Sequence, residues 1–130
     1  MTGAAELEHV RRIALALPHV TERVSHGVPC FFVRDKRPIC YFHDNHAGDG
    51  RTSLWCPATA DAQDELVGSD PERFFRPPTS ARGTFAAWIG VCLDTATNDD
   101  AEDWAEIAAV IEEAFRLVAP KSSIAELDRR

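Results

Sequence analysis

The sequence predicts an α+β fold, a two-layer sandwich in which a largely antiparallel sheet carries helices on one face. Short apolar runs rich in β-branched and aromatic residues are interspersed with stretches whose apolar residues recur at helical spacing. The expected order, α-β-β-β-α-β-β-α, lacks the regular strand-helix alternation of a parallel sheet. With 130 residues, 45% of them hydrophobic, the chain suits a single domain over 1–130, with a core at about 6–121 and a polar tail at 122–130.

The first half of the chain begins with a predicted helix over residues 6–17, which Pro18 ends. A hairpin over residues 28–42 follows, in which two apolar runs flank a polar loop of four or five residues. Because both faces of this hairpin are apolar, both sides of the sheet need cover. A third strand is expected at residues 52–56, where Pro57 ends it.

The second half begins with a short helix at residues 59–67, capped by Thr59 and ended by Gly68. One helical turn at 70–75 and a fourth strand near 76–80 should follow, and then a long central strand at 85–93. A capping box of Asp99 and Glu102 opens the last helix, which has the strongest apolar periodicity in the chain and ends before Pro120. Leu93, Ile107, Ile111 and Phe115 are predicted to share one core.

Composition limits the functional classes. The net charge of −7 argues against a broadly basic nucleic-acid surface but permits a local basic patch. No apolar run is long enough to span a bilayer, and the first residues lack the pattern of a signal peptide, so we expect a cytoplasmic protein. The four cysteines lie in apolar segments at wide spacing, which favours buried, reduced thiols over a zinc site or a disulfide.

The sequence contains no established catalytic motif and no cofactor-binding motif. A nucleophile pair of His26 and Cys30 is conceivable, but the surrounding strand is apolar and shows no orienting group. His43 and His46, with Asp44 and Asp49, form the one cluster with metal-ligand chemistry. Histidines in a polar loop are more often solvated, so we expect no bound metal.

Basic residues form two groups that could contact phosphates as two wings, with Trp88 as a candidate stacking group. The alternative is that arginines at loop tips only keep sheet edges soluble. The first group is Arg34, Lys36 and Arg37 at the hairpin tip, and the second is Arg73, Arg76 and Arg82 around a proline-rich connection.

Four blocks carry a family resemblance: residues 15–20 (LALPHV), 26–34 (HGVPCFFVR), 86–94 (AAWIGVCLD) and 114–121 (AFRLVAPK). In order and spacing they resemble the MmcQ/YjbR-like family over about residues 6–121. The resemblance implies a secretion-chaperone-like or frataxin-like two-layer fold. It also implies a proposed double-wing mode of DNA binding, and it brings no catalytic residues.

Two functional hypotheses follow. The first is a DNA-binding module that contacts phosphates through the two basic loop tips. The second is a non-enzymatic module that binds a protein or a small ligand on an open apolar face of the sheet near Trp55, Trp88 and Gly90. An enzyme is a third, less favoured class. Because exposed apolar faces are uncommon on monomers, we also expect a homodimer.

Overall fold

The computed structural model describes residues 3–78, 87–94 and 101–130, and it confirms the α+β architecture. Six antiparallel strands form one sheet in the order β1-β2-β3-β4-β6-β5. The strands are β1 (Val20–Ser25), β2 (Val28–Val33), β3 (Arg37–Asp44), β4 (Thr52–Cys56), β5 (Phe74–Phe75) and β6 (Ile89–Cys92). The helices are α1 (Ala4–Leu15), α2 (Ala60–Ser69), α3 (Ala101–Val118) and α4 (Lys121–Asp128), with a 3₁₀ turn, η1 (His46–Gly48), before β4.

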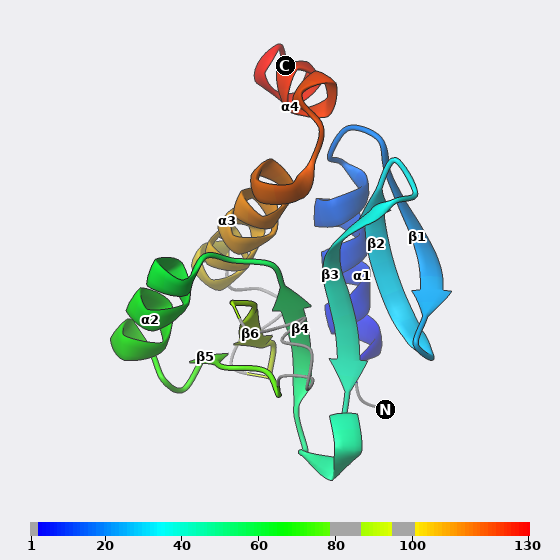
Figure 1. Ribbon diagram of the computed structural model, residues 1–130. Helices are drawn as coiled ribbons and strands as arrows, with labels where there is room; N and C mark the ends of the chain where they lie inside the picture. The colour runs from blue at the N-terminus through cyan, green and yellow to red at the C-terminus, as the bar shows by residue number, and fades with distance from the viewer. Residues whose placement is uncertain (1–2, 79–86, 95–100) are drawn as a thin grey trace.

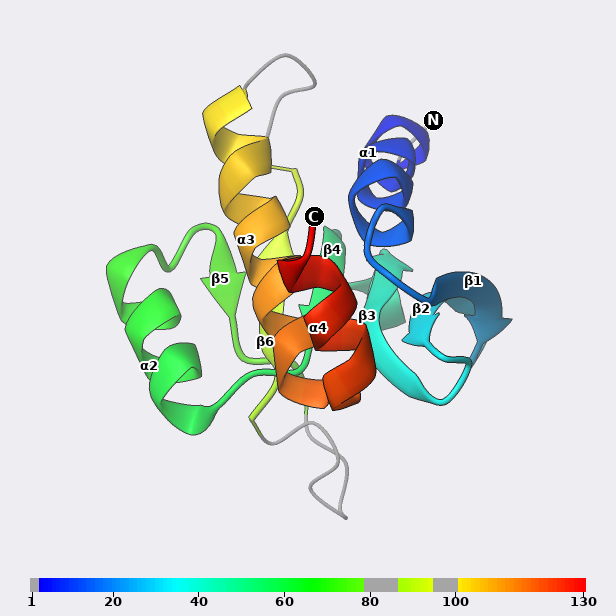
Figure 2. The same cartoon turned by 90° about the horizontal axis from the view of Figure 1, so that it is seen from above.

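Helices α1 and α3 cover one face of the sheet, which we call the inner face (Figure 1). Figure 2 shows α2 beside the β5 edge, and Figure 1 shows α4 at one end of the molecule, beyond the end of α3. None of the helices that the structure describes is long and apolar enough to cross a membrane.

The main core lies between the inner face and the two covering helices. Ile107, Ile111 and Phe115 of α3 are fully buried there, as is Leu93 just after β6, which confirms the predicted core set. Alternate residues of the strands enter this core; in β3, for example, Cys40 and Phe42 face inward. The opposite, outer face carries a smaller cluster, built on Cys30, Phe32, Tyr41 and Trp55.

Several predicted elements differ from those observed. Residues 20–25, expected to be a lead into the hairpin, form the edge strand β1, and the expected polar tail contains helix α4. The strand expected near 76–80 is instead the two-residue β5, immediately before it. The expected strand over 85–93 is β6 with narrower bounds. Residues 79–86 and 95–100, which include Arg82 and the predicted cap at Asp99, lie outside the described residues.

Candidate nucleic-acid interface

The turn between β2 and β3 projects the first basic group from the end of the hairpin. Arg34 and Asp35 both have positive φ (53° and 59°), and Lys36 N–H donates to Val33 O at 3.1 Å. Two central residues of positive φ define a primed turn, whose twist matches that of the flanking strands. Arg34 N–H also donates to His19 O at 2.8 Å, which fixes the turn against the connection between α1 and β1.

Helix α4 holds the Arg34 side chain through hydroxyl groups. The Arg34 guanidinium donates to Ser122 Oγ at 3.2 Å and to Ser123 Oγ at 3.3 Å. Ser123 is fully buried, and its hydroxyl also lies 2.7 Å from His19 Nδ1. Because these partners are neutral hydroxyls, Arg34 is held in place without losing its charge to a carboxylate.

We call Arg34, Lys36 and Arg37 the basic tip. The one carboxylate within this turn, Asp35, accepts a hydrogen bond from Thr21 Oγ1 and pairs with Arg23 at 3.7 Å. All three residues of the basic tip are exposed, and none forms an ion pair with a carboxylate among the residues that the structure describes. The local positive charge of the tip is therefore not compensated, in contrast to the acidic charge of the whole chain.

The basic tip lines a cavity with the junction between α3 and α4. The cavity has a volume of about 670 Å³. Its other lining residues are Val33, Val118, Ala119, Pro120 and Ser122. Cationic side chains beside apolar ones can accept a phosphate group together with the sugar or base attached to it.

The second basic group lies elsewhere in the molecule. Arg73 is 8% exposed, and its guanidinium donates to Asp103 at 2.6 Å and to Glu106 at 2.5 Å, both on α3. Burial alone would lower the pKa of Arg73, but the two carboxylates raise it above its ordinary value. Arg76 is exposed and pairs with Asp64 of α2 at 2.6 Å. Arg82 lies outside the described residues.

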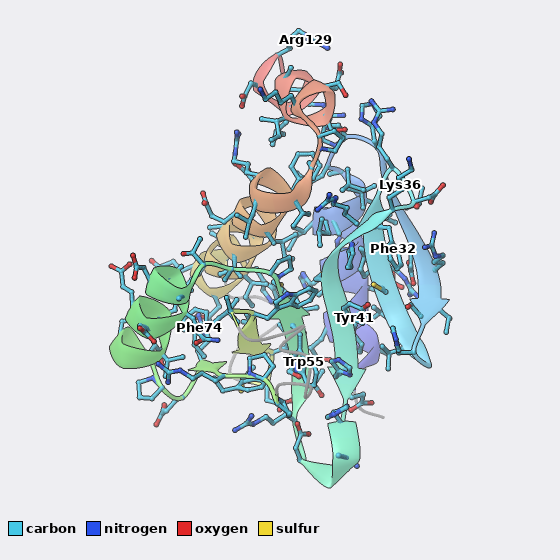
Figure 3. All side chains as sticks on the ribbon, viewed as in Figure 1. Phe32, Lys36, Tyr41, Trp55, Phe74 and Arg129 are labelled. Carbon is cyan, nitrogen blue, oxygen red and sulfur yellow. The ribbon has the colours of Figure 1, made fainter. Side chains whose placement is uncertain are left out.

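The two groups do not converge on one surface. Arg73 and Arg76 flank β5, at one edge of the sheet, whereas the basic tip joins β2 and β3 near the other edge. In Figure 3, Lys36 and Phe74, the neighbour of Arg73, lie far apart. The ion pairs of Arg73 join residues about 30 positions apart, so no local pattern could reveal them.

Trp88, the candidate stacking residue, is half-buried in the outer-face cluster, where its ring lies 5.8 Å from that of Tyr41.

The central aromatic side chains of the outer face are buried rather than exposed. Phe32, Tyr41 and Trp55 lie on neighbouring strands of this face (Figure 3), and each is at most 8% exposed. The Arg23 guanidinium lies over the Phe32 ring at 3.8 Å, and Arg51 lies over Phe75 at 4.0 Å. The expectation of a homodimer and the hypothesis of an apolar docking face both relied on exposed apolar side chains on this face, where Trp55 is 5% exposed and Trp88 is half-buried.

Cys30, the proposed nucleophile, is completely buried in this cluster. Burial raises the pKa of its thiol to about 12, so the thiol stays protonated near neutral pH. His26, the residue proposed to activate it, is exposed on the turn between β1 and β2. A protonated thiol is a poor nucleophile, so this site lacks the chemistry that the pair would need.

His43 and His46 come together, with ring centroids 4.9 Å apart, and both also contact Trp55. Across residues 3–78, 87–94 and 101–130, no three His, Cys, Asp or Glu side chains are grouped so that they could hold a metal ion. The rings form part of an aromatic cluster instead.

Comparisons with known proteins identify a family match and a solved structure of similar fold. The YjbR family model matches residues 15–117. The crystal structure of Deinococcus radiodurans protein DR2400, which has a DUF419 domain, is similar with a TM-score of 0.64 at 17% identity, over 89% of this chain and 80% of that chain. At that identity the likeness shows the fold alone. No curated protein matches the chain.

Proposed function

The chain belongs to the YjbR family, and on that premise we propose that it is a nucleic-acid-binding module whose basic tip contacts backbone phosphates. The observation that carries the proposal is the basic tip itself. Its three cations line one cavity and have no carboxylate partner among the described residues. Cations of this kind are the groups that bind phosphate oxygens without reading sequence.

The proposal uses one wing rather than two. Arg73 is 8% exposed and is committed to Asp103 and Glu106, so releasing it would leave a nearly buried guanidinium without its partners. Arg76 is neutralised by Asp64, although its exposed position would let a phosphate compete for it. Three phosphates at the basic tip are therefore the core of the proposed contact.

With only three phosphate contacts, binding should be weak and should depend only modestly on salt concentration. Three neutralised phosphates correspond to a slope of about −2 to −3 in log affinity against log salt, with affinity on the order of micromolar or weaker at physiological salt. The first turn of α3 carries Glu102 and Asp103, whose charge opposes entry into a groove. We therefore expect little dependence on base sequence.

The test compares two variants that lose the same charge. Replacing Arg34, Lys36 and Arg37 together by serine should weaken binding to unrelated duplexes equally and reduce the salt slope by about 2 to 3, because all three phosphate contacts are removed. Replacing the exposed residues Arg12, Arg51 and Arg129 by serine changes net charge equally and should leave most of the slope. Fluorescence anisotropy with labelled duplexes and single strands measures both, and circular dichroism checks folding.

Two results would contradict the proposal. One is the absence of binding by the wild-type protein to duplex and single strands even at about 20 mM salt, where phosphate contacts are strongest. The other is an equal loss of slope in the two triple variants, which would indicate general charge rather than a site. A separate Arg76→Ser variant that reduces the slope by about 1 would show that the second group also contacts phosphate.

A further inference from the structure

A second cavity lies between α2 and α3, away from the basic tip. Its volume is about 450 Å³, within the range of small-molecule sites, and it opens to solvent beside Leu117. The space exists because small residues, Ala58, Ala62 and Ala109, lie where larger side chains would close it. Leu66, Val110 and Leu117 complete its apolar walls, and Leu117 is 49% exposed at the opening.

Polar contacts at the margins hold the walls of this cavity apart. Gln63 of α2 is buried, and its Nε2 donates to Trp88 O at 2.6 Å, which ties α2 to the segment before β6. On the other side, Arg73 binds Asp103 and Glu106 and ties the segment before β5 to α3. Because Gln63 and Arg73 are both nearly buried, breaking either connection is costly; the helices therefore keep their separation, and the cavity is preformed.

The charges around the cavity leave one carboxylate uncompensated. Arg116 binds Glu112 at 3.1 Å and Asp128 at 2.8 Å, and Glu106 is held by Arg73. Glu113 also lines the cavity, is exposed, and has no ion pair or hydrogen bond with any residue in the described ranges. The electrostatic environment therefore favours a cation at the rim of an otherwise apolar site.

We propose that this cavity binds a small molecule with an apolar body and a cationic amine, whose amine pairs with Glu113. The apolar walls supply most of the affinity through burial of the ligand body. The carboxylate selects the sign of the head group, because an anionic ligand would meet Glu113, while Arg116, the cation that also lines the cavity, is already paired with Glu112 and Asp128. This site is independent of the basic tip, which selects ligands of the opposite charge.

Octylamine and octanoate are the probes, because they share an apolar chain and differ in the sign of the head group. Isothermal titration of the intact protein at pH 7 should show octylamine binding about fivefold more tightly than octanoate, as expected for one exposed ion pair. Glu113→Gln should remove that preference while chain binding remains. Glu65→Gln, an exposed change on α2 outside the cavity, is the matched control and should retain it.

Ala109→Leu tests whether the probes bind in this cavity, since the larger side chain fills the cavity from the exposed surface of α3. It should abolish binding of both probes while circular dichroism remains native. Failure of octylamine to bind the wild-type protein, equal binding of both probes, or unchanged binding by Ala109→Leu would overturn the proposal. So would a concentration-dependent dimer in sedimentation that Ala109→Leu disrupts, because the occupant would then be a second copy of the chain. If Ala109→Leu fails to fold, the exposed Glu113→Gln comparison still decides the role of the carboxylate.

Discussion

His43 lies on the outer face of the sheet, directly across the β3–β4 pair from Ser53. His43 is 6% exposed and Ser53 is fully buried, yet His43 Nε2 and Ser53 Oγ have no hydrogen-bond partner within the described part of the chain. Burial, with a smaller contribution from His46, lowers the pKa of His43 to about 4. The imidazole is therefore neutral near pH 7, and protonating it would place an unpaired charge in an aromatic cluster.

The stability of the protein should consequently fall as the medium is acidified from about pH 6.5 to about pH 4. In this window the unfolded chain binds a proton at His43 that the folded chain excludes, so the loss reaches about 2 to 3 kcal/mol. His43→Phe should flatten this part of the profile and retain stability at pH 7. Urea unfolding at several pH values measures it, with the exposed His26→Gln as control. An unchanged profile in His43→Phe would assign the acid sensitivity to other groups.

The Phe75 ring of β5 leaves no room for a side chain at Gly90 of β6. A Cβ at this position would lie 2.4 Å from two ring atoms of Phe75, well inside contact distance. Gly90→Ala should therefore destabilise the protein by about 1 to 3 kcal/mol, as overpacking does. Gly68→Ala, in α2 with nothing within 4 Å, should instead stabilise it by about 0.5 to 1 kcal/mol.

A double-mutant cycle in urea unfolding identifies the cause of the Gly90 effect. If the ring of Phe75 is responsible, Gly90→Ala should be much less harmful in a Phe75→Ala background. Strict additivity of the two changes would mean that the backbone of β6, and not the contact, requires glycine.

At the scale of elements, α3 is the helix that anchors the inner layer. Its apolar stripe faces β3 and β4, and Trp104 at its first turns also stacks on His9 of α1 with ring centroids 4.2 Å apart. The opposite side of the helix lines the cavity beside α2. One side of α3 is thus fully packed, and the other is not.

Substitutions on the two sides of α3 should differ accordingly. Ile111→Ala, at a fully buried position, should lower the free energy of unfolding by about 2 to 4 kcal/mol through lost burial and a cavity. Leu117→Ala, at a position 49% exposed, should lower it by less than about 1 kcal/mol. Denaturant unfolding of both variants measures this difference. A decrease in the free energy of unfolding below about 1 kcal/mol for Ile111→Ala would contradict the packing described.

The elements that the sequence predicted well are those with strong local signals. Strand β2 is a continuous apolar run, and β4 ends in the apolar residues 54–56 before Pro57. Helix α2 begins after Thr59, whose Oγ1 accepts from Ala62 N–H as a capping residue should. Strand β1 was missed because an exposed edge strand needs few apolar residues, and α4 because its eight residues are mostly polar. Pro120 followed by Ile124 and Leu127 was the available signal for α4.

At the scale of the whole molecule, the sequence predicted the basic tip as a cluster because Arg34, Lys36 and Arg37 are neighbours in one turn. The hydrogen bonds of Arg34 with Ser122 and Ser123 could not be predicted, since they join segments nearly 90 residues apart. The same limit applies to Arg73. The sequence indicates a cation that could bind phosphate, but the folded structure pairs it with two carboxylates. Tertiary pairing therefore decides which charges are available: the chain has a net charge of −7, yet the basic tip has no carboxylate partner among the residues that the structure describes.

The strand order also constrains the sequence of folding events. Strands β1 to β4 pair in chain order, so this meander can assemble from contacts between neighbouring segments, whose loop-closure entropy is small. Strand β5 precedes β6 in the chain, but among the described strands it pairs only with β6, which itself pairs with β4. Strand β5 can therefore join the sheet only through β6, and we expect the β5 edge and the cavity beside α2 to form together with or after the pairing of β6 on β4.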